Sequence, residues 1–181
     1  TINISGGTIG KEGVTGDGAK YSGNVFGGSM GRLTLLDGSP NLLWNRMAQV
    51  KTSSVNITGG TIKRNVYGGA EFGTTRDHVY VTVGGTRAAN GDITPSGSPV
   101  INGSVFGGGK GSTEHRAAYN SYIEAGSGDN AVKYLFTPLQ YAGCIGGDTY
   151  VNVVGNGHVE GSVYGGGELA SVGVIDYRVD E

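Results

Sequence analysis

The stretch Val55–Ala70, VNITGGTIKRNVYGGA, contains an alternating apolar segment, a glycine pair, a valine followed by an aromatic residue, and a second glycine pair. In VNIT the apolar side chains recur at a period of two, which is the period of a β-strand with one buried face. The glycine pairs predict corners that need a positive φ, or places where two backbone segments approach closely. The stretch therefore predicts short strands joined by glycine corners.

This unit occurs four times, as Thr1–Ile9 with Gly23–Ser29, Val55–Ile62 with Asn65–Ala70, Val79–Thr86 with Gly103–Gly111, and Tyr150–Val159 with Gly161–Glu168. A kept motif with variable spacing is typical of stacked repeats whose loops differ in length. We therefore predict an all-β fold, a repeat-built parallel β-helix (β-solenoid) with loop insertions. Residues 1–181 would form a single segment of a longer repeat array.

Equivalent positions of the four copies carry similar side chains, so stacking would place like on like. Such ladders add side-chain hydrogen bonds and ring stacking between neighbouring copies. The predicted ladder consists of Asn24, Val25, Phe26, Asn65, Val66, Tyr67, Ser104, Val105, Phe106, Ser162, Val163 and Tyr164. The predicted corner glycines are Gly6, Gly7, Gly27, Gly28, Gly59, Gly60, Gly68, Gly69, Gly107, Gly108, Gly165 and Gly166.

The aromatic residues of this ladder allow two interpretations. Facing outward, they would form a stacking platform for sugar rings, and facing inward they would be part of the core. We expect core packing or packing between copies, because large apolar groups dominate buried surface.

Two longer segments interrupt the copies, at about residues 33–54 and 111–147, and we expect both to be loops packed over the repeat body. The second contains the densest polar cluster of the chain, Glu114, His115 and Arg116. This cluster is a candidate for ligand contact. An ordinary solvated loop is the favoured alternative, because loops are normally polar and exposed.

Composition excludes several classes of function. The formal net charge is −2 and lysine and arginine form no run, so we expect no nucleic-acid partner. No stretch approaches the roughly 20 apolar residues of a membrane helix, so we expect no membrane insertion in this segment. The single cysteine, Cys144, permits no internal disulfide, and we expect it to be buried.

We assign no catalytic residue, no metal site and no cofactor, and we do not expect an enzyme. The acidic residues do not recur at one repeat position, except that Glu71 and Glu168 both follow a glycine pair. The sequence contains only a weak indication of a calcium site. Asp17 and Asp129 are flanked by glycine, but neither fits the nonapeptide calcium repeat or the EF-hand loop.

The motifs GGTI and GNVFGG, with the variants NVYGGA, SVFGGGKG and SVYGGGE, resemble the glycine-rich GNVYGGG repeats of large surface proteins from gut Bacteroidetes and some Clostridia. The resemblance covers most of the chain apart from the two insertions. It implies a β-helix or a related solenoid and an extracellular or cell-surface location in a bacterium. This chain departs from the pattern where the third copy lacks the asparagine before its valine and the fourth has GNG in place of GGT.

These observations predict a structural or adhesive surface protein. Thr1 begins inside a repeat, and Val174–Val179 resembles the opening of another copy, so neither end has an evident polar cap. The expected partners are further repeats of the same chain or identical copies joined end to end in a fibre. The alternative is a carbohydrate-binding or polysaccharide-degrading β-helix, whose partners would be host or microbial glycans.

Overall fold

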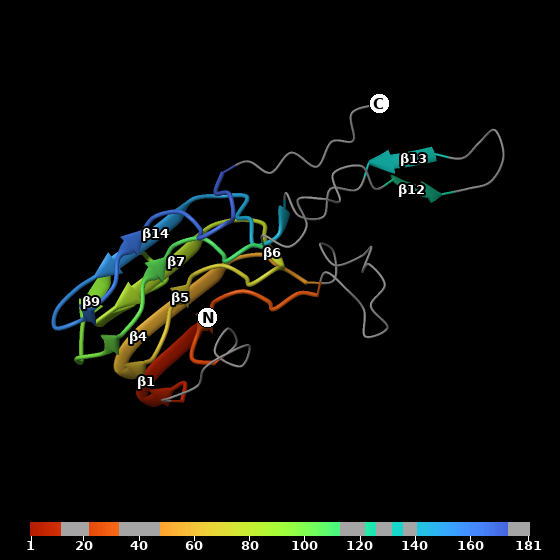
Figure 1. Cartoon of the computed structure of the whole chain (residues 1–181). Coiled ribbons are helices and arrows are strands. Elements are labelled where there is room, and N and C mark those ends of the chain that lie inside the picture. Colours follow the sequence, from red (N-terminus) through yellow and green to blue (C-terminus); the bar gives the residue numbers. More distant parts are fainter. Residues whose placement is uncertain (12–21, 33–47, 113–121, 126–131, 136–140, 174–181) are drawn as a thin grey trace.

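The computed structural model describes residues 1–11, 22–32, 48–112, 122–125, 132–135 and 141–173. Within these ranges the chain forms strands and no helix (Figure 1). Among the same residues, no helix is long and apolar enough to cross a membrane.

The first segment of each copy forms β1 (Ile2–Ile9), β4 (Ser53–Ile62), β7 (Val79–Val83) with β10 (Val100–Ile101), and β14 (Thr149–Val153) with β15 (His158–Val159). The valine and aromatic residue of each copy form β2 (Val25–Phe26), β5 (Val66–Tyr67), β11 (Val105–Phe106) and β16 (Val163–Tyr164). The other strands are β3 (Gln49–Val50), β6 (Thr74–Thr75), β8 (Gly85–Arg87), β9 (Ile93–Pro95), β12 (Tyr122–Ala125) and β13 (Val132–Leu135).

The copies pair through parallel strands. A six-stranded sheet has the order β14-β7-β4-β10-β15, with β1 also paired to β4, and a four-stranded sheet has the order β16-β11-β5-β2. Val55 lies opposite Ile2 on one side and Val81 on the other, and Val81 lies opposite Val151. Figure 1 shows β1, β4, β7 and β14 following one another across the body. Equivalent positions of successive copies are therefore neighbours.

The apolar face of these strands forms the core. Val55, Ile57, Val81 and Val83 are fully buried and belong to one apolar cluster, which also includes Val66 and other valines and isoleucines of the middle copies. Fully burying a side chain of this size contributes about 1.5–3 kcal/mol. The alternation seen in the sequence therefore provides the main apolar contact between the sheets.

The prediction of a repeat-built parallel β-helix (β-solenoid) is wrong. The parallel strands form a nearly closed, barrel-like sheet accompanied by several small sheets. The six-stranded sheet branches at β4, whose first half pairs with β7 and whose second half pairs with β10. Two of the small sheets, β8-β9 and β12-β13, are antiparallel.

The physical reason is the length of β4 and the insertion that follows β7. A strand of 10 residues can hold two shorter strands side by side along one edge. In the third copy, the chain between β7 and β10 folds back as the β8-β9 hairpin. The segment that corresponds to β4 is therefore divided into two strands, β7 and β10. The spacing of the motifs indicates which copies pair. It does not indicate that one strand, β4, pairs with two different strands along the same side.

Parts of the predicted insertions belong to the body. In the first, β3 pairs with β6 in parallel, and β4 begins at Ser53. At the end of the second, Ile145 forms bridges with Thr75 and Val172 and is fully buried. Cys144 is 2% exposed, which confirms the expected burial of this residue.

The glycine pairs have two distinct causes. Gly7 and Gly60 have φ values of 81° and 85°, a backbone conformation that other residues rarely adopt. The glycines that follow Phe26, Tyr67 and Phe106 lie instead where neighbouring copies approach. A Cβ atom on Gly68 would lie 2.6 Å from the Gly107 carbonyl oxygen, whereas one on Gly165 would have nothing within 4 Å.

We predict that Gly68→Ala lowers the free energy of unfolding by about 1–3 kcal/mol, because the added methyl group would overlap the Gly107 carbonyl and the buried side chains of Val79 and Val81 in the next copy. Gly165→Ala is the matched control at the equivalent position, and it should change the stability by less than about 0.5 kcal/mol. Urea unfolding at low protein concentration measures both. Equal losses in the two variants would contradict the role of close approach between copies.

Candidate assembly interface

The aromatic residues of the ladder form one continuous stack, made by Phe26, Tyr67, Phe106 and Tyr164. Successive ring centroids lie 4.9, 5.0 and 4.9 Å apart, with interplanar angles of 8°, 8° and 12°. None of the four rings belongs to the apolar core cluster, because successive residues of a strand face opposite sides of the sheet. Tyr67 is 1% exposed, whereas Tyr164, the last ring, is 48% exposed.

A polar ladder runs beside these rings. The Asn24 side-chain oxygen accepts a hydrogen bond from the Asn65 amide at 3.1 Å, and the Asn65 side-chain oxygen accepts one from the Ser104 amide at 2.9 Å. The Ser104 hydroxyl accepts one from the Ser162 amide at 3.1 Å. Each side chain thus contacts the backbone of the following copy, and the Ser162 hydroxyl stands at the end of the series.

The amide at one equivalent position of three successive strands donates to the following copy. The amides of Val25, Val66 and Val105 donate to the carbonyl oxygens of Asn65, Ser104 and Ser162 at 3.0, 2.9 and 2.9 Å. Within the described ranges no strand follows β16 in this sheet. The amide of Val163 occupies the equivalent donor position in β16, and it faces the side on which a further copy would pair.

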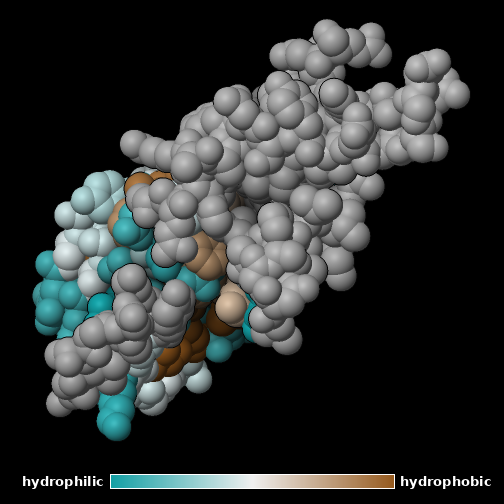
Figure 2. All heavy atoms as spheres, turned by 45° about the vertical axis from the view of Figure 1, so that its right-hand side comes forward, coloured by the Kyte–Doolittle hydropathy of each residue, from teal (hydrophilic) through white to brown (hydrophobic). Residues whose placement is uncertain are grey.

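This outer side also exposes apolar side chains. We define the β14–β16 edge as the outer side of β14, β15 and β16 together with the segment that ends near Val172. Its exposed apolar residues are between 37% and 50% exposed and comprise Tyr150, Val153, Val163, Tyr164, Leu169 and Val172. In the coloured part of Figure 2, teal and white residues surround smaller brown apolar patches.

The two acidic residues that follow a glycine pair are both held in structural interactions. The Tyr67 hydroxyl donates a hydrogen bond to the Glu168 carboxylate and accepts one from the Asn65 side-chain amide at 2.9 Å. The Lys110 ammonium lies 2.9 Å from the Glu71 carboxylate, which is largely buried. Equivalent positions of successive copies are occupied by Glu71, Lys110 and Glu168, so the sign of the charge alternates along this column.

Burial raises the pKa of the Tyr67 hydroxyl far above its ordinary value, and the hydrogen bond to Glu168 raises it further. Both effects favour the neutral phenol, because ionisation would place a negative charge in a buried position beside a carboxylate. This cluster therefore depends on a protonated Tyr67.

Sequence reasoning missed a second aromatic group, on the outer face of β7 and β14. The rings of Tyr80 and Tyr150 stack at 5.1 Å, and the Arg87 guanidinium lies 3.8 Å from the centroid of Tyr80. The Asp148 amide donates to Nδ1 of His78 at 3.0 Å, and the Asp148 carboxylate raises the pKa of Tyr150. Both tyrosines directly precede an aligned valine, which is the signal that could have revealed them.

Glu114, His115 and Arg116 lie outside the described residues, as do Asp17 and Asp129. Among the residues that are described, no group of three or more His, Cys, Asp or Glu side chains could hold a metal ion.

No protein-family model, no curated protein and no solved structure matches this chain.

We predict that the contribution of Tyr67 to stability falls as the pH rises above about 10. Above that pH the unfolded chain releases the phenol proton, whereas the folded chain retains it, so the free energy of unfolding decreases with pH. Tyr67→Phe lacks this proton and should lose about 1–2 kcal/mol near neutral pH.

Denaturant titrations of both proteins between pH 8 and pH 11, read by circular dichroism, measure the difference. The difference should shrink toward pH 11, and a constant difference would contradict the role assigned to Tyr67.

Proposed function

We propose that this chain is a structural, adhesin-type segment of a bacterial cell-surface or secreted protein, and that it extends by end-to-end strand pairing. The observation that supports this proposal is the β14–β16 edge, where ladders of rings, amides and side-chain oxygens reach an exposed outer strand. The bacterial surface location rests on the resemblance of the GNVYGG-type motifs to repeats of surface proteins.

An exposed edge of this kind favours pairing, because an outer strand offers a row of backbone donors and acceptors to another chain. The edge also combines these groups with apolar side chains, whose burial would contribute to association. Its partners would be further repeats of the same chain or identical copies.

We propose no catalytic role and no cofactor. Of the acidic residues that the repeat positions single out, Glu71 pairs with Lys110 and Glu168 accepts a hydrogen bond from Tyr67. These contacts give both carboxylates a role in holding the copies together.

We predict that the protein self-associates as its concentration rises and that Val163→Lys weakens the association at least tenfold. The substitution would place a charge on the outer strand of the edge, where pairing would have to desolvate it. Ala89→Lys, an exposed change in the turn of the β8-β9 hairpin, is the control.

Sedimentation velocity over a concentration series measures the association, and circular dichroism checks that both variants keep their strands. A protein that stays monomeric at all concentrations would contradict the proposal, and so would a Val163→Lys variant that associates like Ala89→Lys.

Saccharide binding is the second candidate, and the Tyr80–Tyr150 pair favours it. The Tyr150 ring is 45% exposed, and the Asp148 carboxylate lies 3.4 Å from its hydroxyl. An exposed ring beside a polar group is suited to stacking against a sugar while hydrogen-bonding its hydroxyl groups.

A glycan array separates the two candidates. Saccharide binding predicts a signal that Tyr150→Ala abolishes and that Val163→Lys retains. The structural proposal predicts no signal that depends on Tyr150.

A further inference from the structure

We infer that a second copy of this chain pairs the outer side of its β1 and β2, the β1–β2 edge, with the β14–β16 edge of the first. The two copies would lie head to tail, in the register that the internal copies use. This inference rests on the proposed function and specifies its partner, polarity and register.

The register follows from continuing the pairing already present. Val55 lies opposite Ile2 and Val81, and Val81 lies opposite Val151, so one position recurs through all four copies. A fifth strand in the same register would place Ile2 of the second copy opposite Val151 and Ile4 opposite Val153. Val153 is 42% exposed, and this pairing would cover it.

The asparagines at the intervening position match as well. Asn3 and Asn56 lie opposite each other, and the Asn56 side-chain amide donates to the Asn3 side-chain oxygen at 2.9 Å. Asn152 occupies the same position in β14. It would meet Asn3 of the second copy, which repeats the asparagine pair that joins the first and second copies inside the chain.

The shorter strands fit in the same arrangement. The ring of Tyr164 would stack on Phe26 of the second copy, as every internal pair in this column stacks at 4.9–5.0 Å. Open space beside Gly165 would receive backbone, as the space beside Gly68 receives the Gly107 carbonyl. Val25 is already buried in its own copy, so β2 would contribute its backbone and the Phe26 ring.

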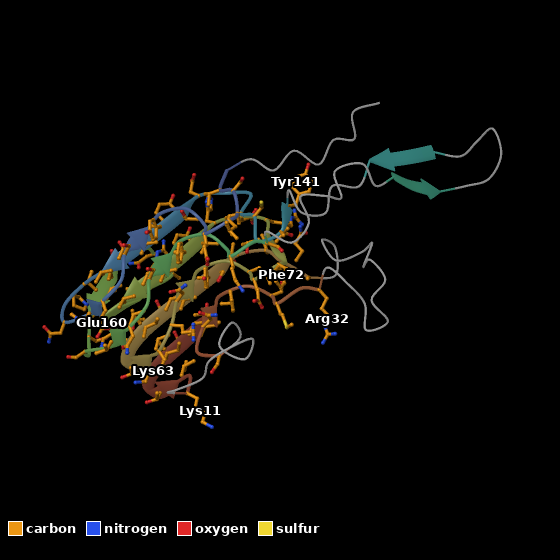
Figure 3. All side chains as sticks on the ribbon, in the orientation of Figure 1. Lys11, Arg32, Lys63, Phe72, Tyr141 and Glu160 are labelled. Carbon is orange, nitrogen blue, oxygen red and sulfur yellow. The ribbon has the colours of Figure 1, made fainter. Side chains whose placement is uncertain are left out.

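Charge favours this polarity. Among the described residues of the first copy, the charged side chains are those of Lys11 and Arg32, whereas the described part of the fourth copy carries Asp148, Glu160 and Glu168. Figure 3 shows Lys11 below β1 and Glu160 at the left-hand corner of the body, near the strand that Figure 1 labels β9. Opposite charges would meet in head-to-tail pairing, and like charges would meet if two β14–β16 edges paired.

One specific ion pair follows from the register. The last aligned position of the longer strands is occupied by Ile9, Ile62, Ile101 and Val159 in the four copies. The residue after it donates its amide to the preceding copy: Lys63 to the Ile9 carbonyl at 3.0 Å, and Glu160 to the Ile101 carbonyl at 2.9 Å. Glu160 would therefore lie beside the Gly10–Lys11 corner of the second copy. Because the two edges differ, this contact leaves an edge open at each end and forms a filament.

Cysteine pairing tests the register in the full chain, with Cys144→Ala as the background. Asn3→Cys and Asn152→Cys are placed in separate proteins, which are mixed and oxidised. Paired strands lie about 4.8 Å apart, within the range that a disulfide spans. We expect the mixture to yield at least fivefold more disulfide dimer than either protein alone, and more than Thr1→Cys mixed with Asn152→Cys, which is two residues out of register.

A charge swap tests the polarity. Glu160→Lys should weaken self-association by about threefold to tenfold, and Lys11→Glu in the same chain should restore it. If sedimentation detects no association of the unmodified chain, both the proposed function and this inference fail. If the chain associates but neither the Asn3–Asn152 disulfide nor the charge rescue is selective, the inference is overturned and the proposed function stands.

Discussion

The structure depends on hydrogen bonds between the same position in successive copies. The amides of Val25, Val66 and Val105 each donate to a carbonyl oxygen of the copy that follows. The side-chain oxygens of Asn24, Asn65 and Ser104 each accept a hydrogen bond from a backbone amide of that following copy. Once this register is set, equivalent rings must stack and equivalent glycines must lie against backbone. The sheet therefore tolerates loops of different length between copies, but it does not tolerate a shift within the motif.

This constraint explains how much of the molecule can be predicted from the sequence. The positions that face each other repeat by residue type, so the ring column and the Asn and Ser ladder can be derived from the motif alone. The fold class could not be predicted, because nothing in the spacing indicates that β4 divides its edge between β7 and β10. The hydrogen bond between Tyr67 and Glu168 was also missed, since it joins residues 101 positions apart whose copies are not adjacent.

The candidate interface is a consequence of the same regularity. Within the chain, each copy presents to the next a set of donors, a ring face and space beside a glycine. The fourth copy presents that set to the exterior, where Val163 and Tyr164 are each 48% exposed. Apolar groups that the second and third copies bury are thus available for pairing, and the contrast in charge between the two edges gives that pairing a direction.

Amide hydrogen exchange, resolved by residue in dilute, monomeric protein, tests the in-register hydrogen bonding most directly. The account predicts slow exchange for the amides of Val66 and Val105, which donate to the following copy, and fast exchange for Val163 at the equivalent position of the outer strand. Fast exchange at Val66 and Val105, or protection of Val163 equal to theirs in the monomer, would contradict it.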